Sequence, residues 1–225
     1  MIDAGKPRVA IVDYGVGNLF SVRNACAHAG MEAVITASRR DILAADAVIL
    51  PGVGAFGDAM AMLEERGLTD LLREIARSGK PFLGICLGMQ LLMTESFEFG
   101  RWPGLGIIPG TVVRLENRSK RGEPVKVPQV CWNTLHRTEG RGDTWEGTLL
   151  KDLPDGVFMY FVHSFYVKPD DDEVSIALTR YGAQSFCSAM RYGNIFACQF
   201  HPERSGPPGL KIYRNLAEIV KASRK

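Results

Sequence analysis

The chain has 225 residues, enough for one large domain or two small ones, and a chain of this length can bury roughly 70% of its unfolded surface. Its hydrophobic share of 46% and charged share of 23% are those of an ordinary globular protein, and a net charge of +2 argues against nucleic acid or an anionic membrane as the main partner. Five cysteines without paired spacing, no apolar signal region and no run that could cross a bilayer lead us to expect a reduced, cytoplasmic protein.

The first half of the chain alternates short apolar runs with amphipathic segments. It predicts strands at 9–12, 33–35, 47–50 and 81–85, and helices between Asn18 and Gly30 and at 58–66, 68–77 and 89–93. Asn18 is placed to cap the first helix and Gly30 to end it. Alternation of this kind indicates a parallel sheet covered by helices on both faces.

The second half is richer in strands. We expect strands at 106–115, 158–162, 174–179, 185–190 and 195–200, followed by a helix at 210–222. No linker, repeat or low-complexity tract divides the chain. The prediction is therefore a single α/β domain over residues 1–225, with a core at about 8–222.

The most informative motif is Gly84-Ile85-Cys86-Leu87-Gly88, between an apolar run and a helical one. A glycine-x-nucleophile-x-glycine turn from strand to helix is a nucleophile elbow, in which a crowded bend pushes the central side chain into a cleft. The backbone N–H groups at the start of the helix favour a thiolate there. Cys86 is therefore a candidate nucleophile, although a lone cysteine is more often an inert buried side chain.

A second motif, Gln199-Phe200-His201-Pro202-Glu203, supplies a histidine and a carboxylate two residues apart at an expected strand end. Because extended chain has a period of two, His201 and Glu203 can project to the same side. With Cys86 they form the nucleophile, base and orienting acid of a catalytic triad. His28 and His136 have no such context and are expected to be structural or on the surface. Cys26, Cys187 and Cys198 are expected to be inert buried side chains.

Two charged stretches have ordinary explanations. Arg118–Arg121 with Lys126 could dock an anionic partner, but a solvated hairpin tip is the better interpretation. The acidic run 170–173 lacks the spacing of a calcium loop, so we expect a solvated turn and no metal site.

The two motifs closely resemble the signatures of the class I (triad-type) glutamine amidotransferases. The similarity covers nearly the whole chain and is closest to the glutaminase subunit of imidazole glycerol phosphate synthase. Four further segments carry it: Asp13–Leu19, Pro51–Phe56, Pro128 with Trp132-Asn133, and Tyr160–Ser164. The resemblance implies a flavodoxin-like fold with a mostly parallel central sheet, glutamine hydrolysis and no cofactor.

The resemblance also implies roles for individual residues. Cys86 would attack the glutamine carboxamide, His201 would shuttle the proton, and Glu203 would orient the imidazole. The oxyanion would be held by the N–H of Leu87 and by the Gly52-Val53 peptide, in a loop that two glycines leave free to reorient when a partner is loaded. The residues expected to hold the substrate are Gln90, Ser164 with backbone near His163 and Phe165, and, as a weaker candidate, Glu98.

A partner is expected because the glutaminase takes up the whole chain and leaves no room for an ammonia acceptor. The resemblance implies a (β/α)8-barrel cyclase of histidine biosynthesis, with Trp132 and Asn133 at the interface. The family usually shows Pro-His-Met-Gly-Trp-Asn where this chain has Pro128-Gln129-Val130-Cys131-Trp132-Asn133. That departure keeps open a paralogous glutaminase that feeds a surface-polysaccharide sugar-synthesis enzyme. A stand-alone cysteine peptidase or γ-glutamyl hydrolase of the same fold is a further alternative, which Gln90 and the Pro51–Gly54 loop disfavour.

Overall fold

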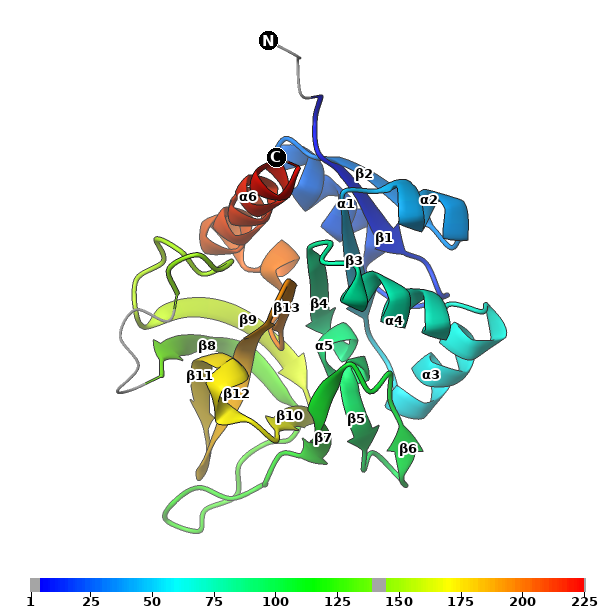
Figure 1. The fold of residues 1–225 in the computed structure, drawn as a ribbon. Helices are drawn as coiled ribbons and strands as arrows, with labels where there is room; N and C mark the ends of the chain where they lie inside the picture. Colours follow the sequence, from blue (N-terminus) through cyan, green and yellow to red (C-terminus); the bar gives the residue numbers. More distant parts are fainter. Residues whose placement is uncertain (1–4, 139–144, 225) are drawn as a thin grey trace.

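The structure is a computed structural model that describes residues 5–138 and 145–224, and its centre is a nine-stranded sheet (Figure 1). Five neighbouring strands run parallel, in the order β2 (Glu32–Thr36), β1 (Arg8–Val12), β3 (Ala47–Gly52), β4 (Phe82–Cys86) and β13 (Ile195–Cys198). The sheet continues antiparallel through β12 (Gln184–Tyr192), β11 (Ser175–Tyr181), β8 (Gln129–Arg137) and β9 (Val157–His163).

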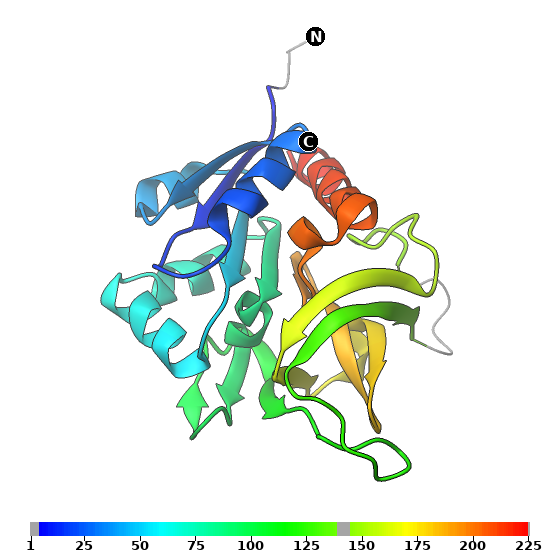
Figure 2. The same cartoon turned by 180° about the vertical axis from the view of Figure 1, so that it is seen from behind.

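Helices cover both faces of the parallel strands, as the alternation predicts. Successive residues of β1 divide between two cores: Val9 and Ile11 face one, Ala10 and Val12 the other. The first core is covered by α1 (Leu19–His28) and α6 (Gly206–Ser223), which lie in front in Figure 2. The second is covered by α2 (Arg39–Ala44), α3 (Phe56–Glu65) and α4 (Thr69–Arg77), in front in Figure 1.

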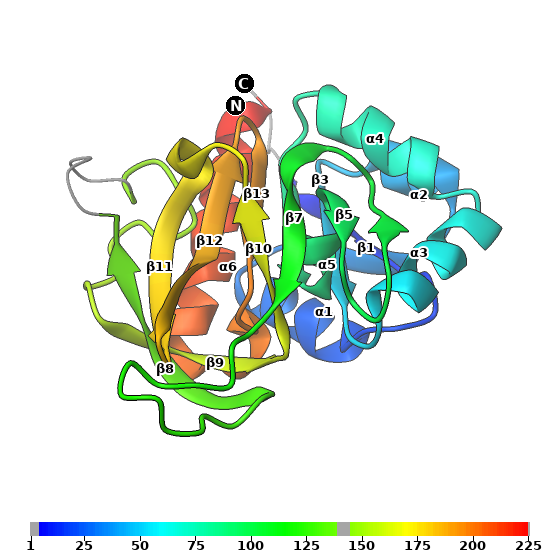
Figure 3. The ribbon, with the colours of Figure 1, turned by 90° about the horizontal axis from the view of Figure 1, so that it is seen from below.

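A second, four-stranded sheet lies beside the first and is seen edge to edge with it from below (Figure 3). Its strand order is β10 (Phe165–Pro169), β7 (Ile108–Arg114), β5 (Met93–Ser96) and β6 (Trp102–Pro103). Only β7 among these strands was expected from the sequence. The predicted helix at 89–93 is also wrong in extent, because α5 (Leu87–Leu91) ends where Met93 pairs with Ile108.

The two charged stretches are solvated turns. Residues 118–124 form an exposed hairpin closed by one bridge between Arg118 and Pro124. Asp171 caps a single 3-10 turn, η1 (Asp172–Val174), through a bond from the Glu173 N–H. Within residues 5–138 and 145–224, no helix is long and apolar enough to cross a membrane.

Candidate active site

Cys86 lies at the carboxyl end of β4, directly before α5, with φ 55° and ψ −110°. A non-glycine residue at positive φ is strained, and such strain is concentrated at functional sites. The two flanking glycines are required by close packing. A Cβ at Gly84 would come within 3.0 Å of the Gly88 carbonyl oxygen, and a Cβ at Gly88 would overlap the Leu50 carbonyl of β3. The strand, elbow and helix predicted here are all present.

His201 and Glu203 form a buried hydrogen-bonded pair, with 2.8 Å between His201 Nδ1 and Glu203 Oε1. The predicted contact is present, but the predicted reason is wrong. Strand β13 ends at Cys198, and Pro202–Arg204 form a 3-10 turn, η2. The turn is fixed by bonds from the His201 N–H to the Tyr160 carbonyl at 2.9 Å and from the Ser205 hydroxyl to the His201 carbonyl at 2.6 Å.

The imidazole of His201 is electrostatically coupled to the thiol. Burial lowers the pKa of His201, but the nearby Cys86 sulfur and the hydrogen-bonded carboxylate of Glu203 outweigh that effect and raise this pKa to about 10. His201 thus keeps its proton at neutral pH when Cys86 is a thiolate. The arrangement places a thiol, an imidazole and a carboxylate in series, the three groups that a cysteine triad needs.

Gln199, for which no role was expected from the sequence, links the Cys86 sulfur to Gln90. The amide nitrogen of Gln199, which is fully buried, lies 3.6 Å from Cys86 Sγ. Its amide oxygen accepts a hydrogen bond of 3.1 Å from Gln90 Nε2, which also donates to the Phe165 carbonyl at 2.9 Å. Both of these hydrogen bonds use the amide nitrogen of Gln90. The amide oxygen of Gln90 therefore remains to accept a hydrogen bond from a ligand. The only sequence signal was the place of Gln199 two residues before His201.

Cys86 and Gln90 line a cavity of about 220 Å³, and His201, Glu203 and Gln199 are not among the residues that line it. It lies at the carboxyl ends of the parallel strands, where ligands bind in open α/β sheets. The cavity takes in most of the predicted site residues, which are contributed by the elbow, the loop after β3, the β5–β6 turn and the β9–β10 junction. Its lining is Val53, Gly54, Cys86, Leu87, Gln90, Glu98, Val162, His163, Ser164 and Phe165.

The two segments expected to form an oxyanion hole are adjacent. Gly52 pairs with Cys86 in the β3–β4 ladder, and Leu87 begins α5. Tyr14 donates a hydrogen bond of 2.9 Å to the Pro51 carbonyl, an anchor that the sequence did not reveal. Gly54 has φ +109° and open space around it, whereas a Cβ at Gly52 would overlap the Tyr14 hydroxyl. Conformational freedom therefore belongs to Gly54, and Gly52 is required for packing.

His163 is buried and neutral. Burial lowers its pKa to about 4, although a 2.8 Å bond from Nδ1 to the Phe165 carbonyl opposes the shift. Its ring packs against Phe161 and Phe186. His163 therefore shapes the wall of the cavity and is not a second charged base.

Trp132 lies on β8 with its side chain outward and 51% exposed, which excludes a core tryptophan. Asn133 points the other way, because successive strand residues alternate, and its amide donates to the Arg180 carbonyl at 2.9 Å. Of the two expected interface residues, only Trp132 faces outward. Three residues of β8 differ from the usual family motif. Gln129 and Cys131 lie on the inward face of the strand and contact one another, and Val130 lies on the exposed face.

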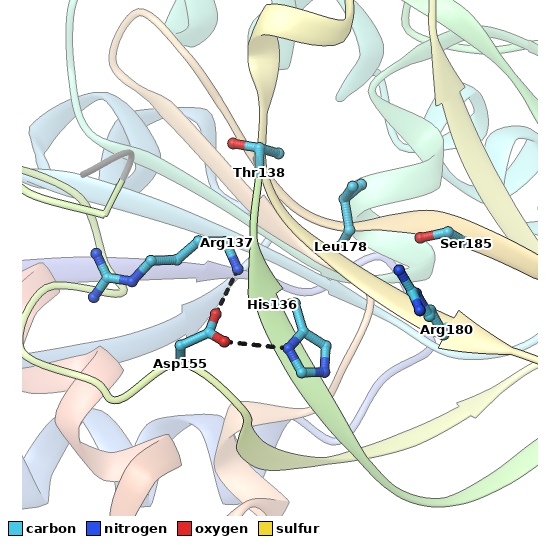
Figure 4. Close-up of a pocket in the computed structure, with 7 residues that line it drawn as sticks. All are labelled: His136, Arg137, Thr138, Asp155, Leu178, Arg180 and Ser185. Carbon is cyan, nitrogen blue, oxygen red and sulfur yellow. Dashed lines mark hydrogen bonds and ion pairs between the residues drawn. The ribbon is translucent and has the colours of Figure 1, made fainter. Parts of the chain in front are cut away.

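A larger cavity, of about 650 Å³, lies at the end of β8 that carries His136 and Arg137 (Figure 4). It contains a second histidine–carboxylate pair, His136 Nδ1 and Asp155 Oδ2, at 3.3 Å. No cysteine lines it, and the other ring nitrogen of His136, Nε2, lies 2.9 Å from the Thr134 hydroxyl. Cys26, Cys187 and Cys198 are buried, and burial raises the pKa of each thiol. In the described part of the chain no group of three or more metal-ligating side chains forms a metal site.

Comparisons with known proteins agree with this geometry. A sequence model described as glutamine amidotransferase class-I matches residues 10–219. The chain is 47% identical to the imidazole glycerol phosphate synthase subunit HisH of Geobacter metallireducens, over 93% of this chain and 97% of that protein. It is 43% identical to the subunit HisH of Moorella thermoacetica, over 95% of each chain.

Solved structures support the fold alone, since their sequence identities are low. PurLQS from Thermotoga maritima superposes with a TM-score of 0.70 at 20% identity, covering 97% of this chain and 99% of that one. A crystal structure of a glutamine amidotransferase gives 0.68 at 22%, covering 93% and 98%. The chain thus belongs to the class-I glutamine amidotransferases and, among them, to the glutaminase subunits HisH of imidazole glycerol phosphate synthase.

Proposed function

We propose that this chain hydrolyses glutamine to glutamate and ammonia through a thioester on Cys86. The observation that carries the proposal is the buried His201–Glu203 pair, 2.8 Å apart and coupled to the Cys86 sulfur at the edge of a small cavity. Those groups supply a nucleophile, a proton carrier and its orienting acid. The protein needs no cofactor for this reaction.

In the first step the Cys86 thiolate attacks the carboxamide carbon, and the oxyanion is held by the Leu87 N–H and the Gly52-Val53 peptide. His201 then gives its proton to the departing nitrogen, and the C–N bond breaks to release ammonia. Water, deprotonated by His201, attacks the thioester, and the C–S bond breaks to free glutamate and to return the sulfur as a thiolate beside protonated His201. Glu203 keeps the imidazole in one tautomer and stabilises its protonated form.

Glutamine is held by groups that already line the cavity. The free amide oxygen of Gln90 accepts a bond from the substrate. Ser164, with the backbone of His163 and Phe165, holds the α-carboxylate and amino groups. Glu98 binds the α-ammonium group through its carboxylate.

A second protein would receive the ammonia. An apolar stripe on β8 and β9, made of Val130, Trp132, Phe158 and Val162, lies beside the cavity and offers a surface on which such a protein could dock. Strands β8 and β9 pair Val130 with Val162, Trp132 with Tyr160 and Thr134 with Phe158. Val130, Trp132 and Phe158 are each half exposed or more, and Val162 lines the cavity itself. An exposed aromatic stripe that reaches a catalytic cavity is typical of an interface.

The partner proposed for this stripe is the (β/α)8-barrel cyclase of the same synthase, which gives a heterodimer. It would use ammonia to form imidazole glycerol phosphate and an aminoimidazole-carboxamide ribotide in histidine biosynthesis. Ammonia passed internally escapes protonation in water. The five free cysteines fit the reducing conditions of the cytoplasm.

The Pro51–Gly54 loop is the element through which the partner would act. We propose that the Gly52-Val53 peptide turns its N–H toward the oxyanion when the partner is loaded, with Gly54 as the hinge. Gly54→Ala is the better test, because Gly52→Ala would also disrupt the packing on Tyr14. Gly54→Ala should reduce stimulation by the partner more than glutamine binding, and equal loss of both would contradict the loop hypothesis.

The decisive experiment for the function is Cys86→Ala in complex with the cyclase. Glutamine-dependent synthesis should be abolished, while synthesis from added ammonium salt and formation of the complex should persist. Continued glutamine hydrolysis by this variant would refute the assignment of the nucleophile.

A further inference from the structure

Glu98 sits in the turn of a short hairpin. Strands β5 and β6 pair Ser96 with Trp102 and leave 97–101 as the turn between them. An ion pair of 2.5 Å between Arg101 and Glu95 closes its base. The hairpin thus presents Glu98 to the cavity from a short, closed segment.

Three hydrogen bonds fix Glu98 in this turn. Its carboxylate Oε2 accepts from the Phe56 N–H at 2.6 Å, its backbone N–H donates to the Ser96 hydroxyl at 3.2 Å, and its carbonyl accepts from the Trp102 indole at 2.9 Å. The first of these bonds caps α3, whose N-cap residue Ala55 has no side chain that could do so.

The indole of Trp102 contacts both sides of this arrangement. It donates to the Glu98 carbonyl, and its ring lies flat on Gly57, in the first turn of α3. A Cβ at Gly57 would be 2.9 Å from ring atoms Cδ2 and Cε2, so only glycine permits this approach. One side chain therefore sets the distance between the turn that carries Glu98 and the helix end that holds its carboxylate.

Helix capping alone does not account for Glu98. Capping uses only Oε2, and within the described residues Oε1 makes no hydrogen bond. The carboxylate lines the same cavity as Cys86 and Gln90, where an unshared oxygen can receive a cation. Burial raises the pKa of Glu98, and the Phe56 N–H opposes this shift.

We propose that Trp102 and Gly57 are a positioning pair that holds the Glu98 carboxylate for the α-ammonium group of glutamine. Through Glu98 they set the preference of the enzyme for amides that carry this group. The inference rests on the proposed function, because it assumes that glutamine occupies the cavity. Trp102 itself does not line the cavity, so its effect on the substrate is indirect.

The test compares glutamine with glutaramate, which has the same skeleton and amide but lacks the α-ammonium group. Trp102→Phe keeps a ring on Gly57 and loses the indole donor, Trp102→Ala loses both, and Gly57→Ala displaces the ring. For each variant with the cyclase, kcat and KM are measured for both compounds. Where glutaramate turnover is too slow, its competitive inhibition of glutamine hydrolysis is used.

We expect KM for glutamine to rise about tenfold in Trp102→Ala and Gly57→Ala, and less in Trp102→Phe, with kcat within about twofold, as a displaced binding group predicts. The constants for glutaramate should not change, and Glu98→Gln should show the same selective loss. Trp145→Phe is the matched control, since it removes another indole bond to a carbonyl, 2.7 Å to Ile176, in the core.

Equal loss for both compounds in the Trp102 variants would reduce the residue to a structural role and overturn the proposal, as would no loss for either. A selective loss in Glu98→Gln without one in the Trp102 and Gly57 variants would also overturn it. Failure of the proposed function is separate, because it would appear as glutamine hydrolysis by Cys86→Ala.

Discussion

Replacing Glu203 with glutamine tests how much the carboxylate contributes through His201. The two side chains are almost completely buried and 2.8 Å apart, so the imidazolium formed during catalysis has no water to replace the lost charge. Breaking a buried ion pair costs about 3–5 kcal/mol. At 1.36 kcal/mol per tenfold, this range corresponds to roughly 10²- to 10⁴-fold in rate.

For Glu203→Gln we expect a loss of rate near the lower end of this range, with kcat/KM for glutamine reduced about 10²- to 10³-fold. The loss is not larger because the amide oxygen of the new side chain can still accept the hydrogen bond from His201 Nδ1. The assay is glutamate release by the variant in complex with the cyclase, beside ammonia-dependent synthesis by the same preparation. The second activity should be unchanged, which separates loss of the glutaminase from loss of the complex.

Asp155→Asn is the control, since it alters a second histidine–carboxylate pair, which is about half exposed and has no thiol beside it. It should leave glutamine turnover unaffected. If Glu203→Gln is folded and retains kcat/KM within about threefold of the parent, the carboxylate does not act through His201 and the reasoning fails.

Three further predictions use other contacts of the site. Gln199→Leu removes the amide beside the Cys86 sulfur, so kcat/KM for glutamine should fall about 10-fold or more, the effect of one hydrogen bond to a charged group. An unchanged value would show that the Gln199 amide does not support Cys86. Tyr14→Phe leaves the Pro51 carbonyl without its donor, which should lower the free energy of unfolding by about 1–3 kcal/mol in urea titrations and raise partner-free glutamine hydrolysis. Folding lowers the pKa of His163 from 6.5 to about 4, so the unfolded chain binds a proton at this residue at a higher pH than the folded chain does. The free energy of unfolding should therefore decrease by up to ~3 kcal/mol as the pH falls from 6.5 toward 4. His163→Gln should flatten this dependence between pH 7 and pH 4.5, and an equally steep decline in the variant would contradict it.

The parallel half of the fold could be predicted because buried strands and amphipathic helices each leave a pattern in the sequence. Strand β8 leaves a weaker pattern, since Val130 and Trp132 are apolar but exposed. Strand β6 has only two residues, too few to leave a pattern. Strand β5 directly follows α5, and the change from helix to strand occurs because Met93 pairs with Ile108 of β7. Tertiary contacts, not local preference, determine these elements. That residues 1–225 form a single domain stays a prediction.

The elbow at Cys86 and the contact between His201 and Glu203 could be predicted because their motifs are local and chemically distinctive, while their catalytic roles stay a prediction. The residues that hold the site in place through hydrogen bonds could not be predicted, because those hydrogen bonds join segments that are far apart in the sequence. Tyr14 reaches Pro51 across 37 positions, and Glu98 reaches Phe56 across 42. Gln199 carries no feature that marks it as a partner of Cys86. Side chains that orient other side chains emerge only from the packed structure.

The most direct test is mass spectrometry of the protein, acid-quenched while it turns over glutamine with its partner. The mechanism predicts one glutamyl group per chain, located by peptide mapping on Cys86, present in the parent and absent from Cys86→Ala. A glutamyl group on another cysteine, or turnover without any covalent species while Cys86→Ala remains active, would contradict the account.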